Sequence, residues 1–136
     1  MIEDVDAKQA YEALSANPDA QMVDVRTDAE WTYVGLPDLS PLGKRVLLVQ
    51  WQGFPSGAPN NSFVEQLGAA GLTRQHTVYF LCRSGARSLA AAEAAEQAGY
   101  RTVFNVSDGF EGPPDAQGHR GNVAGWQADG LPWRQR

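Results

Sequence analysis

Short apolar runs alternate along this chain with polar segments that carry a helical spacing. Four of the runs are rich in β-branched and aromatic residues, which is typical of buried strands. They lie at residues 21–25, 46–49, 77–81 and 102–106. Because these runs show little alternation of apolar and polar residues, we expect them in a sheet that is covered on both faces.

Helices are predicted between the runs. Asp6 can cap a helix that passes through Ala7, Tyr11 and Leu14, whose spacing places apolar side chains on one face. Two capping boxes predict further helix starts, Thr27 with Glu30 and Ser62 with Glu65. The first opens a short helix through Trp31 and Tyr33, and the second a helix over Phe63, Val64 and Leu67.

The longest predicted helix is the segment from Leu89 to Ala98, made mostly of strong helix formers and ended by Gly99. Helix and strand thus alternate, which predicts an α/β fold: a parallel sheet with helices on both faces. A chain of 136 residues suits one compact core, so we expect a single domain over residues 1–136.

Composition and charge exclude several classes of function. The net charge of -5 disfavours nucleic acid as a partner, because phosphate binding needs a basic surface. Neither an apolar stretch long enough to span a bilayer nor a basic and then apolar amino terminus is present, so we expect no membrane association and a cytoplasmic location. The only cysteine excludes an internal disulfide and a cysteine-based zinc cluster, and we expect no metal site.

That cysteine, Cys82, follows the run at 77–81 and precedes the alanine-rich helix. The first turn of a helix offers free backbone N–H groups and partial positive charge, which stabilise an anion. Arg83 and Arg87 add positive charge, so the thiolate form of Cys82 is favoured, and Gly85 allows the loop to curl. A lone cysteine is usually an inert buried thiol. An inert thiol would not account for the two arginines and the glycine next to Cys82.

The heptapeptide Cys82–Ser88 after an apolar strand resembles the active-site loop of the single-domain rhodaneses, the thiosulfate sulfurtransferases. The segment 23–31, with Asp24, Arg26 and Glu30, is similar to the Asp-Val-Arg-x-x-x-Glu-aromatic signature of that family. The segment 130–132 resembles the closing segment of the family. The resemblance covers nearly the whole chain and implies the rhodanese-like fold.

The resemblance also implies a reaction. A sulfane sulfur would pass from thiosulfate or a related anionic donor to Cys82 as a persulfide, and then to a thiol or to cyanide, without a cofactor. The loop residues that would hold the substrate are Arg83, Ser84, Gly85, Ala86, Arg87 and Ser88. Near the site, an Arg26–Glu30 ion pair would fix the loop, and Asp24 would orient nearby backbone.

Two other functions remain open. Cysteine-dependent phosphatases and arsenate reductases resemble this loop, but phosphatases place five residues between cysteine and arginine, whereas four separate Cys82 from Arg87. The shorter loop favours a sulfur atom over a tetrahedral oxyanion. The second alternative is a rhodanese-like module that carries sulfur to a dedicated acceptor or only binds a partner, although the presence of Cys82 disfavours an inactive module.

Two irregular segments could border the site. The loop 52–61 could form a wall of the pocket, with Trp51 and Phe54 either flanking substrate or packing on the core. The segment Pro113–Gly121 is interpreted as an insertion before a terminal helix over residues 123–130, and its His119 and Arg120 could line the mouth of the site. The sequence specifies neither the natural donor and acceptor, nor the pathway, nor the oligomeric state.

Overall fold

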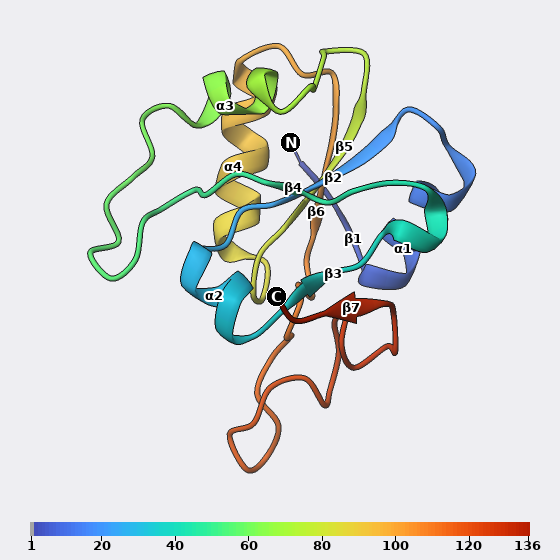
Figure 1. Cartoon of the computed structure of the whole chain (residues 1–136), viewed down its shortest axis with the longest axis vertical. Helices are drawn as coiled ribbons and strands as arrows, with labels where there is room; N and C mark the ends of the chain where they lie inside the picture. The colour runs from blue at the N-terminus through green and yellow to red at the C-terminus, as the bar shows by residue number, and fades with distance from the viewer. Residues whose placement is uncertain (1) are drawn as a thin grey trace.

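A five-stranded parallel sheet forms the centre of the computed structural model, which describes residues 2–136 (Figure 1). The strand order is β1-β6-β5-β2-β4. The strands span Glu3–Val5 (β1), Ala20–Asp24 (β2), Leu47–Leu48 (β4), Thr77–Leu81 (β5) and Thr102–Val106 (β6). A separate antiparallel pair joins Leu36–Pro37 (β3) to Trp133–Arg134 (β7). The predicted α/β class with a parallel sheet is confirmed.

Helices cover both faces of the sheet, as the alternating pattern predicts. They span Ala7–Ala16 (α1), Asp28–Tyr33 (α2), Phe63–Ala69 (α3) and Ala86–Gln97 (α4), with a 3-10 turn at Ser40–Leu42. Because successive strand residues point to opposite faces, Val78 and Phe80 of β5 pack with α3 and α4, whereas Tyr79 and Leu81 pack with α1 and α2. In residues 2–136 no helix is long and apolar enough to cross a membrane.

The first two predicted helix caps are present. Asp6 accepts a hydrogen bond from the Gln9 backbone N–H, and Thr27 and Glu30 cap each other's backbone at the start of α2. The third is wrong, because the Ser62 side chain makes no capping hydrogen bond. The side chain of Asn60 organises this turn instead, accepting from the Ser62 N–H and donating to the carbonyl of Gln50.

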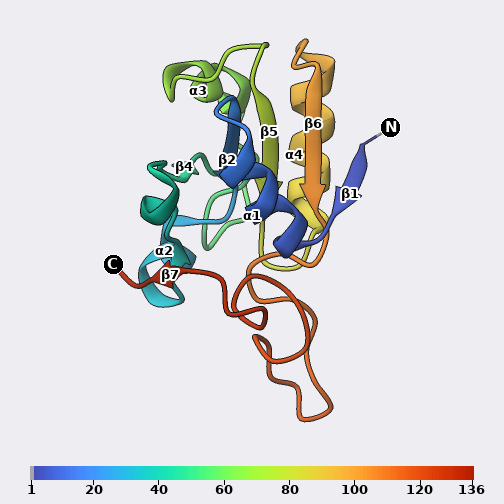
Figure 2. The ribbon, with the colours of Figure 1, turned by 90° about the vertical axis from the view of Figure 1, so that its right-hand side faces the viewer.

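The chain between β6 and β7 is the largest departure from the prediction. Residues 121–130 form bends and turns, not the predicted helix, and this loop extends beyond the end of the sheet (Figure 2). Gly125 has a φ of 104°, and the Trp126 N–H donates to the carbonyl of Gly109. The N–H groups of Trp126 and Gln127 thus bond to the turn after β6 rather than within a helix.

Parallel pairing brings the carboxyl ends of the central strands to one edge. Asp24 at the end of β2 lies opposite Leu81 at the end of β5, and Phe80 lies opposite Asn105 of β6. The segments that follow these strands therefore meet at one edge of the sheet, where open α/β sheets place their ligands.

Candidate active site

The loop after β5 holds Cys82 at the head of α4. Cys82 is 1% exposed, and its Sγ accepts a hydrogen bond from the Gly85 N–H at 3.1 Å. Gly85 has a φ of 106°, and a Cβ there would lie 2.4 Å from the carbonyl oxygen of Ser107. The loop can therefore curl under the sulfur only because residue 85 is glycine, as predicted.

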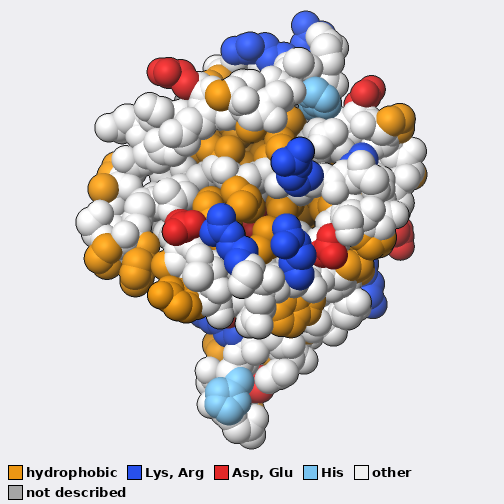
Figure 3. Space-filling model, viewed as in Figure 1, with side chains coloured by type: hydrophobic (Ala, Val, Ile, Leu, Met, Phe, Trp, Pro, Cys, Tyr) orange, Lys and Arg blue, Asp and Glu red, His pale blue; other side chains and the backbone are white. Residues whose placement is uncertain are grey.

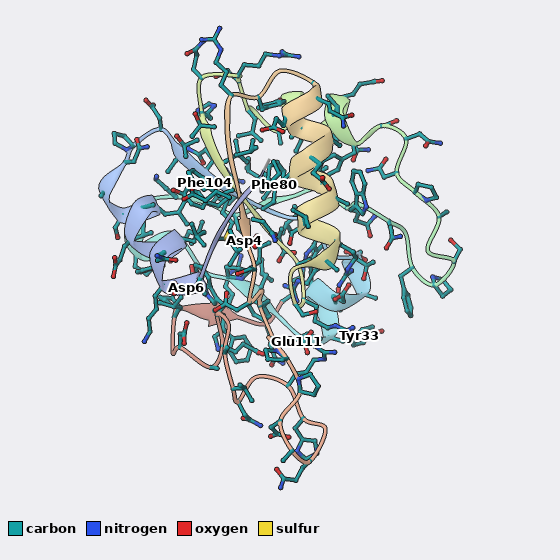
Figure 4. The ribbon with its side chains drawn as sticks, turned by 180° about the vertical axis from the view of Figure 1, so that it is seen from behind. Asp4, Asp6, Tyr33, Phe80, Phe104 and Glu111 are labelled. Atoms are coloured by element: carbon teal, nitrogen blue, oxygen red, sulfur yellow. The ribbon has the colours of Figure 1, made fainter. Side chains whose placement is uncertain are left out.

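A hydrogen-bond chain runs from Cys82 to the edge of the sheet. Ser88 Oγ on α4 lies 3.2 Å from Cys82 Sγ and 2.6 Å from Asn105 Oδ1. The Asn105 amide nitrogen donates to the carbonyl of Gly85 and to the carboxylate of Asp4, which lies on the edge strand β1 (Figure 4). Since a hydroxyl has a single proton, Asn105 and Cys82 compete for the Ser88 proton.

This chain gives a stability prediction for Ser88→Ala. The change leaves the oxygen of Asn105, a residue that is 3% exposed, without its donor, which costs about 1–3 kcal/mol. Urea unfolding should show this loss, whereas Ser84→Ala, on an exposed serine of the same loop, should leave the free energy of unfolding unchanged. Equal stabilities for the two variants would contradict the role given to Ser88.

Arg26 and Arg87 form ion pairs, but not the pair that the resemblance implied. Arg26 is fully buried and donates to Asp24, with Nη2 at 2.7 Å from the carboxylate, and to the carbonyl of Gly35. The expected Arg26–Glu30 ion pair is therefore wrong, because Arg26 turns into the interior while Glu30 faces α4. Asp24 also accepts from the Arg26 backbone N–H, in line with its expected orienting role.

Glu30 instead pairs with Arg87 of the cysteine loop. The two guanidinium–carboxylate distances are 2.6 Å and 2.9 Å. Burial alone would raise the pKa of Glu30, but the hydrogen bonds and charge of Arg87 outweigh it and lower that pKa. The hydrogen bonds to Glu30 in turn raise the pKa of Arg87. Arg87 thus already has an anionic partner before any substrate binds.

A pocket of about 600 Å³ opens beside the loop. Its walls come from α2, from the loop 52–57 and from the side chains of Arg83, Arg87 and Glu111. The predicted wall is therefore present: Phe54 lines it, whereas Trp51 packs edge-on against Phe63. Figure 3 shows basic and acidic side chains side by side around exposed hydrophobic ones near the centre of this face.

The predicted contribution of the insertion is wrong. His119 and Arg120 do not line the pocket, and the guanidinium of Arg120 donates to the carbonyl of Gly112 within its own loop. In residues 2–136 no three His, Cys, Asp or Glu side chains come together as a metal site.

The sequence analysis did not predict the backbone hydrogen bonds that hold the cysteine loop in place. The Phe110 N–H donates to the carbonyl of Cys82, and the N–H groups of Glu111 and Gly112 donate to that of Arg83. Asn105 and Asp4 were also missed. The glycines of the turn, Gly109 and Gly112, were the signal available, since Gly109 has a positive φ and a Cβ there would collide with Arg83.

Comparisons with known proteins agree with this geometry. Residues 3–136 match the family model of the STR4 middle domain. A solved structure of Rv0390 from M. tuberculosis is 51% identical, with a TM-score of 0.91 and 98% of each chain covered. The uncharacterized protein RC0915 of Rickettsia conorii is 35% identical over 98% of both chains.

Two more distant relatives have informative names. Rhodanese-like domain-containing protein 4 of Arabidopsis thaliana is 28% identical, over 93% of this chain and 24% of its own length. A protein of Allochromatium vinosum named sulfurtransferase is 26% identical, over 97% of this chain and 94% of its own. The parallel sheet with a cysteine loop at its carboxyl edge is that of a rhodanese-like domain. Within that class, the chain belongs to the STR4 middle domain family.

Proposed function

We propose that the protein is a sulfurtransferase that carries a sulfane sulfur on Cys82. The observation that carries this proposal is the setting of Cys82 Sγ, which meets the Gly85 N–H and the Ser88 hydroxyl at the head of α4. A fixed backbone donor such as the Gly85 N–H stabilises a charged sulfur and is worth about 3 kcal/mol when preorganised.

The reaction has two half-reactions. The Cys82 thiolate attacks the outer sulfur of thiosulfate, so a Cys82 S–S bond forms, the bond between the two thiosulfate sulfurs breaks, and sulfite leaves with the electron pair. A second nucleophile then attacks the outer persulfide sulfur, and Cys82 leaves as the thiolate. The sequence is covalent, ping-pong catalysis, and atoms and electrons balance without a cofactor.

The thiosulfate–cyanide reaction tests the proposal. Purified protein should produce thiocyanate at a rate that saturates in both substrates, with the parallel-line pattern of a ping-pong mechanism. The absence of thiocyanate with thiosulfate, and also with an organic persulfide as donor, would contradict the proposed activity. A role as a sulfur carrier for a dedicated partner shares the first half-reaction and differs only in the acceptor.

The Glu30–Arg87 pair bears on the phosphatase alternative. A phosphatase needs its loop arginine free to hold a tetrahedral oxyanion, whereas both Glu30 oxygens are hydrogen-bonded to Arg87. The pairing therefore supports sulfur transfer over phosphate chemistry. It also means that an anionic donor competes with Glu30 for Arg87.

This competition predicts opposite effects of two substitutions. Glu30→Gln keeps the cap on Thr27 but releases Arg87, so the KM for thiosulfate should fall about fivefold. Arg87→Ala removes the cation, so the same KM should rise by a similar factor. Steady-state kinetics with varied thiosulfate measure both, and an unchanged KM in both variants would show that the pair serves only the structure.

A further inference from the structure

The pocket beside the cysteine loop contains two charged side chains, those of Arg83 and Glu111, that have no partner among the residues that the structure describes. Arg83 directly follows Cys82, and the Glu111 N–H donates to the Arg83 carbonyl, so their backbones are adjacent. Both side chains line the pocket. Within residues 2–136, neither side chain makes a hydrogen bond or an ion pair, whereas Arg87 and Glu30 neutralise each other. The pocket thus presents one free cation and one free anion.

Part of the lining of the pocket is aromatic and exposed. Tyr33 on α2 is 80% exposed and Phe54 on the loop 52–57 is 70% exposed, and both side chains line the pocket. Figure 4 shows Tyr33 and Glu111 close to each other on different segments, and both residues line the same pocket. Exposed aromatic side chains that share a pocket with unpaired charges are typical of a binding site.

The size and the charges of the pocket suit an occupant larger than the two assay substrates, thiosulfate and cyanide. Cyanide and thiosulfate have only a few non-hydrogen atoms, whereas a volume near 600 Å³ is in the range of organic ligands. A dianion would meet Arg83 but also be repelled by Glu111. A molecule with one carboxylate, one ammonium group and an apolar part matches all three features of the walls.

We infer that this pocket is the acceptor subsite and that it takes an amino-acid-like thiol, such as a small cysteine peptide. Its carboxylate binds Arg83, its ammonium group binds Glu111, and its apolar part lies on Tyr33 and Phe54. This inference rests on the proposed function. The acceptor sulfur attacks the outer sulfur of the Cys82 persulfide, a new S–S bond forms on the acceptor, and Cys82 recovers the electron pair as its thiolate.

Four small thiols distinguish the contribution of Arg83 from that of Glu111. L-cysteine has both groups, 3-mercaptopropionate only the carboxylate, cysteamine only the ammonium group, and 2-mercaptoethanol neither. The measurement is the rate at which each thiol discharges protein preloaded with sulfur, expressed for each variant relative to the wild type. Since each ratio compares one thiol with itself, differences in thiol reactivity cancel.

Arg83→Ala should slow discharge by L-cysteine and 3-mercaptopropionate about three- to fivefold and leave cysteamine and 2-mercaptoethanol unchanged. Glu111→Gln should slow L-cysteine and cysteamine by a similar factor and spare the other two. For the apolar wall, Tyr33→Ala should reduce the preference for cysteinyl-phenylalanine over cysteinyl-glycine. Val123→Ala is the control, since Val123 is 57% exposed but lies outside the pocket.

Equal effects on all four thiols, or none, would overturn the inference and favour a protein thiol or another acceptor. Discharge by cyanide is measured on the same preparations. If persulfide forms and cyanide removes it while the thiols show no charge dependence, the acceptor subsite is wrong and the sulfurtransferase proposal survives. If no persulfide forms at all, the proposed function itself fails.

Discussion

Cys82→Ser should reduce sulfur transfer to the background rate, a loss of more than about 10³-fold, because the step requires a sulfur nucleophile that can form and leave a persulfide. The fold should survive. Cys82 is 1% exposed and packs in the core cluster that includes Phe80 and Ala91, and a serine oxygen is smaller than the sulfur that it replaces.

The measurement is the rate of thiocyanate formation, with thermal unfolding of the same samples as the control for folding. A variant that unfolds near the wild-type temperature but has no activity supports the assignment of Cys82. Turnover at the wild-type rate in the serine variant would contradict it, since the persulfide route would then be absent.

Gly85→Ala should have the second largest effect. The new Cβ would lie 2.4 Å from the Ser107 oxygen, so the loop must move and the Gly85 N–H must leave the Cys82 sulfur, now 3.1 Å away. Loss of one preorganised donor corresponds to a rate about 10²-fold lower. The positive φ adds about 1–2 kcal/mol of strain for any residue with a side chain.

Gly71→Ala is the matched control for Gly85→Ala. Gly71 has a φ of 101°, close to that of Gly85, but a Cβ there meets nothing within 4 Å. Its replacement should therefore cost backbone strain alone and leave the catalytic rate unchanged. If Gly85→Ala kept the wild-type rate and lost no more stability than Gly71→Ala, the loop geometry would not matter for transfer.

The parts of the fold that the sequence predicted are those with strong local signals. The apolar runs 77–81 and 102–106 correspond to β5 and β6, and Asp6 and Thr27 do cap α1 and α2. Glu3–Val5 was missed because two of its three residues are acidic, and pairing with β6 makes it a strand. The strand predicted at 46–49 shortens to Leu47–Leu48.

The sequence placed the residues of the cysteine loop together but did not predict their partners elsewhere in the chain, for a related reason. Cys82, Gly85 and Arg87 are close in sequence, so the loop pattern contains them together. The partners of this loop come from far along the chain: Glu30 pairs with Arg87 across 57 positions, and Asn105 bonds to Ser88 across 17. Only the parallel register, which aligns the ends of β2, β5 and β6, places them there.

The helix predicted at residues 123–130 was wrong for a different reason. Residues 123–130 contain Ala124, Trp126 and Ala128, which suit a helix, but Gly125 interrupts them. Trp126 is completely buried, and its indole N–H donates to the carbonyl of Pro132. Burial of this side chain, together with backbone hydrogen bonds to residues 109 and 110, outweighs the local helical preference.

The central claim is that Cys82 carries the transferred sulfur, and the intact mass of the protein under non-reducing conditions tests it most directly. After incubation with thiosulfate, the wild type should gain the mass of one sulfur atom, and cyanide should remove it, while Cys82→Ser should gain nothing. A wild-type mass that does not change with thiosulfate or with an organic persulfide, or the same gain in the serine variant, would contradict the claim.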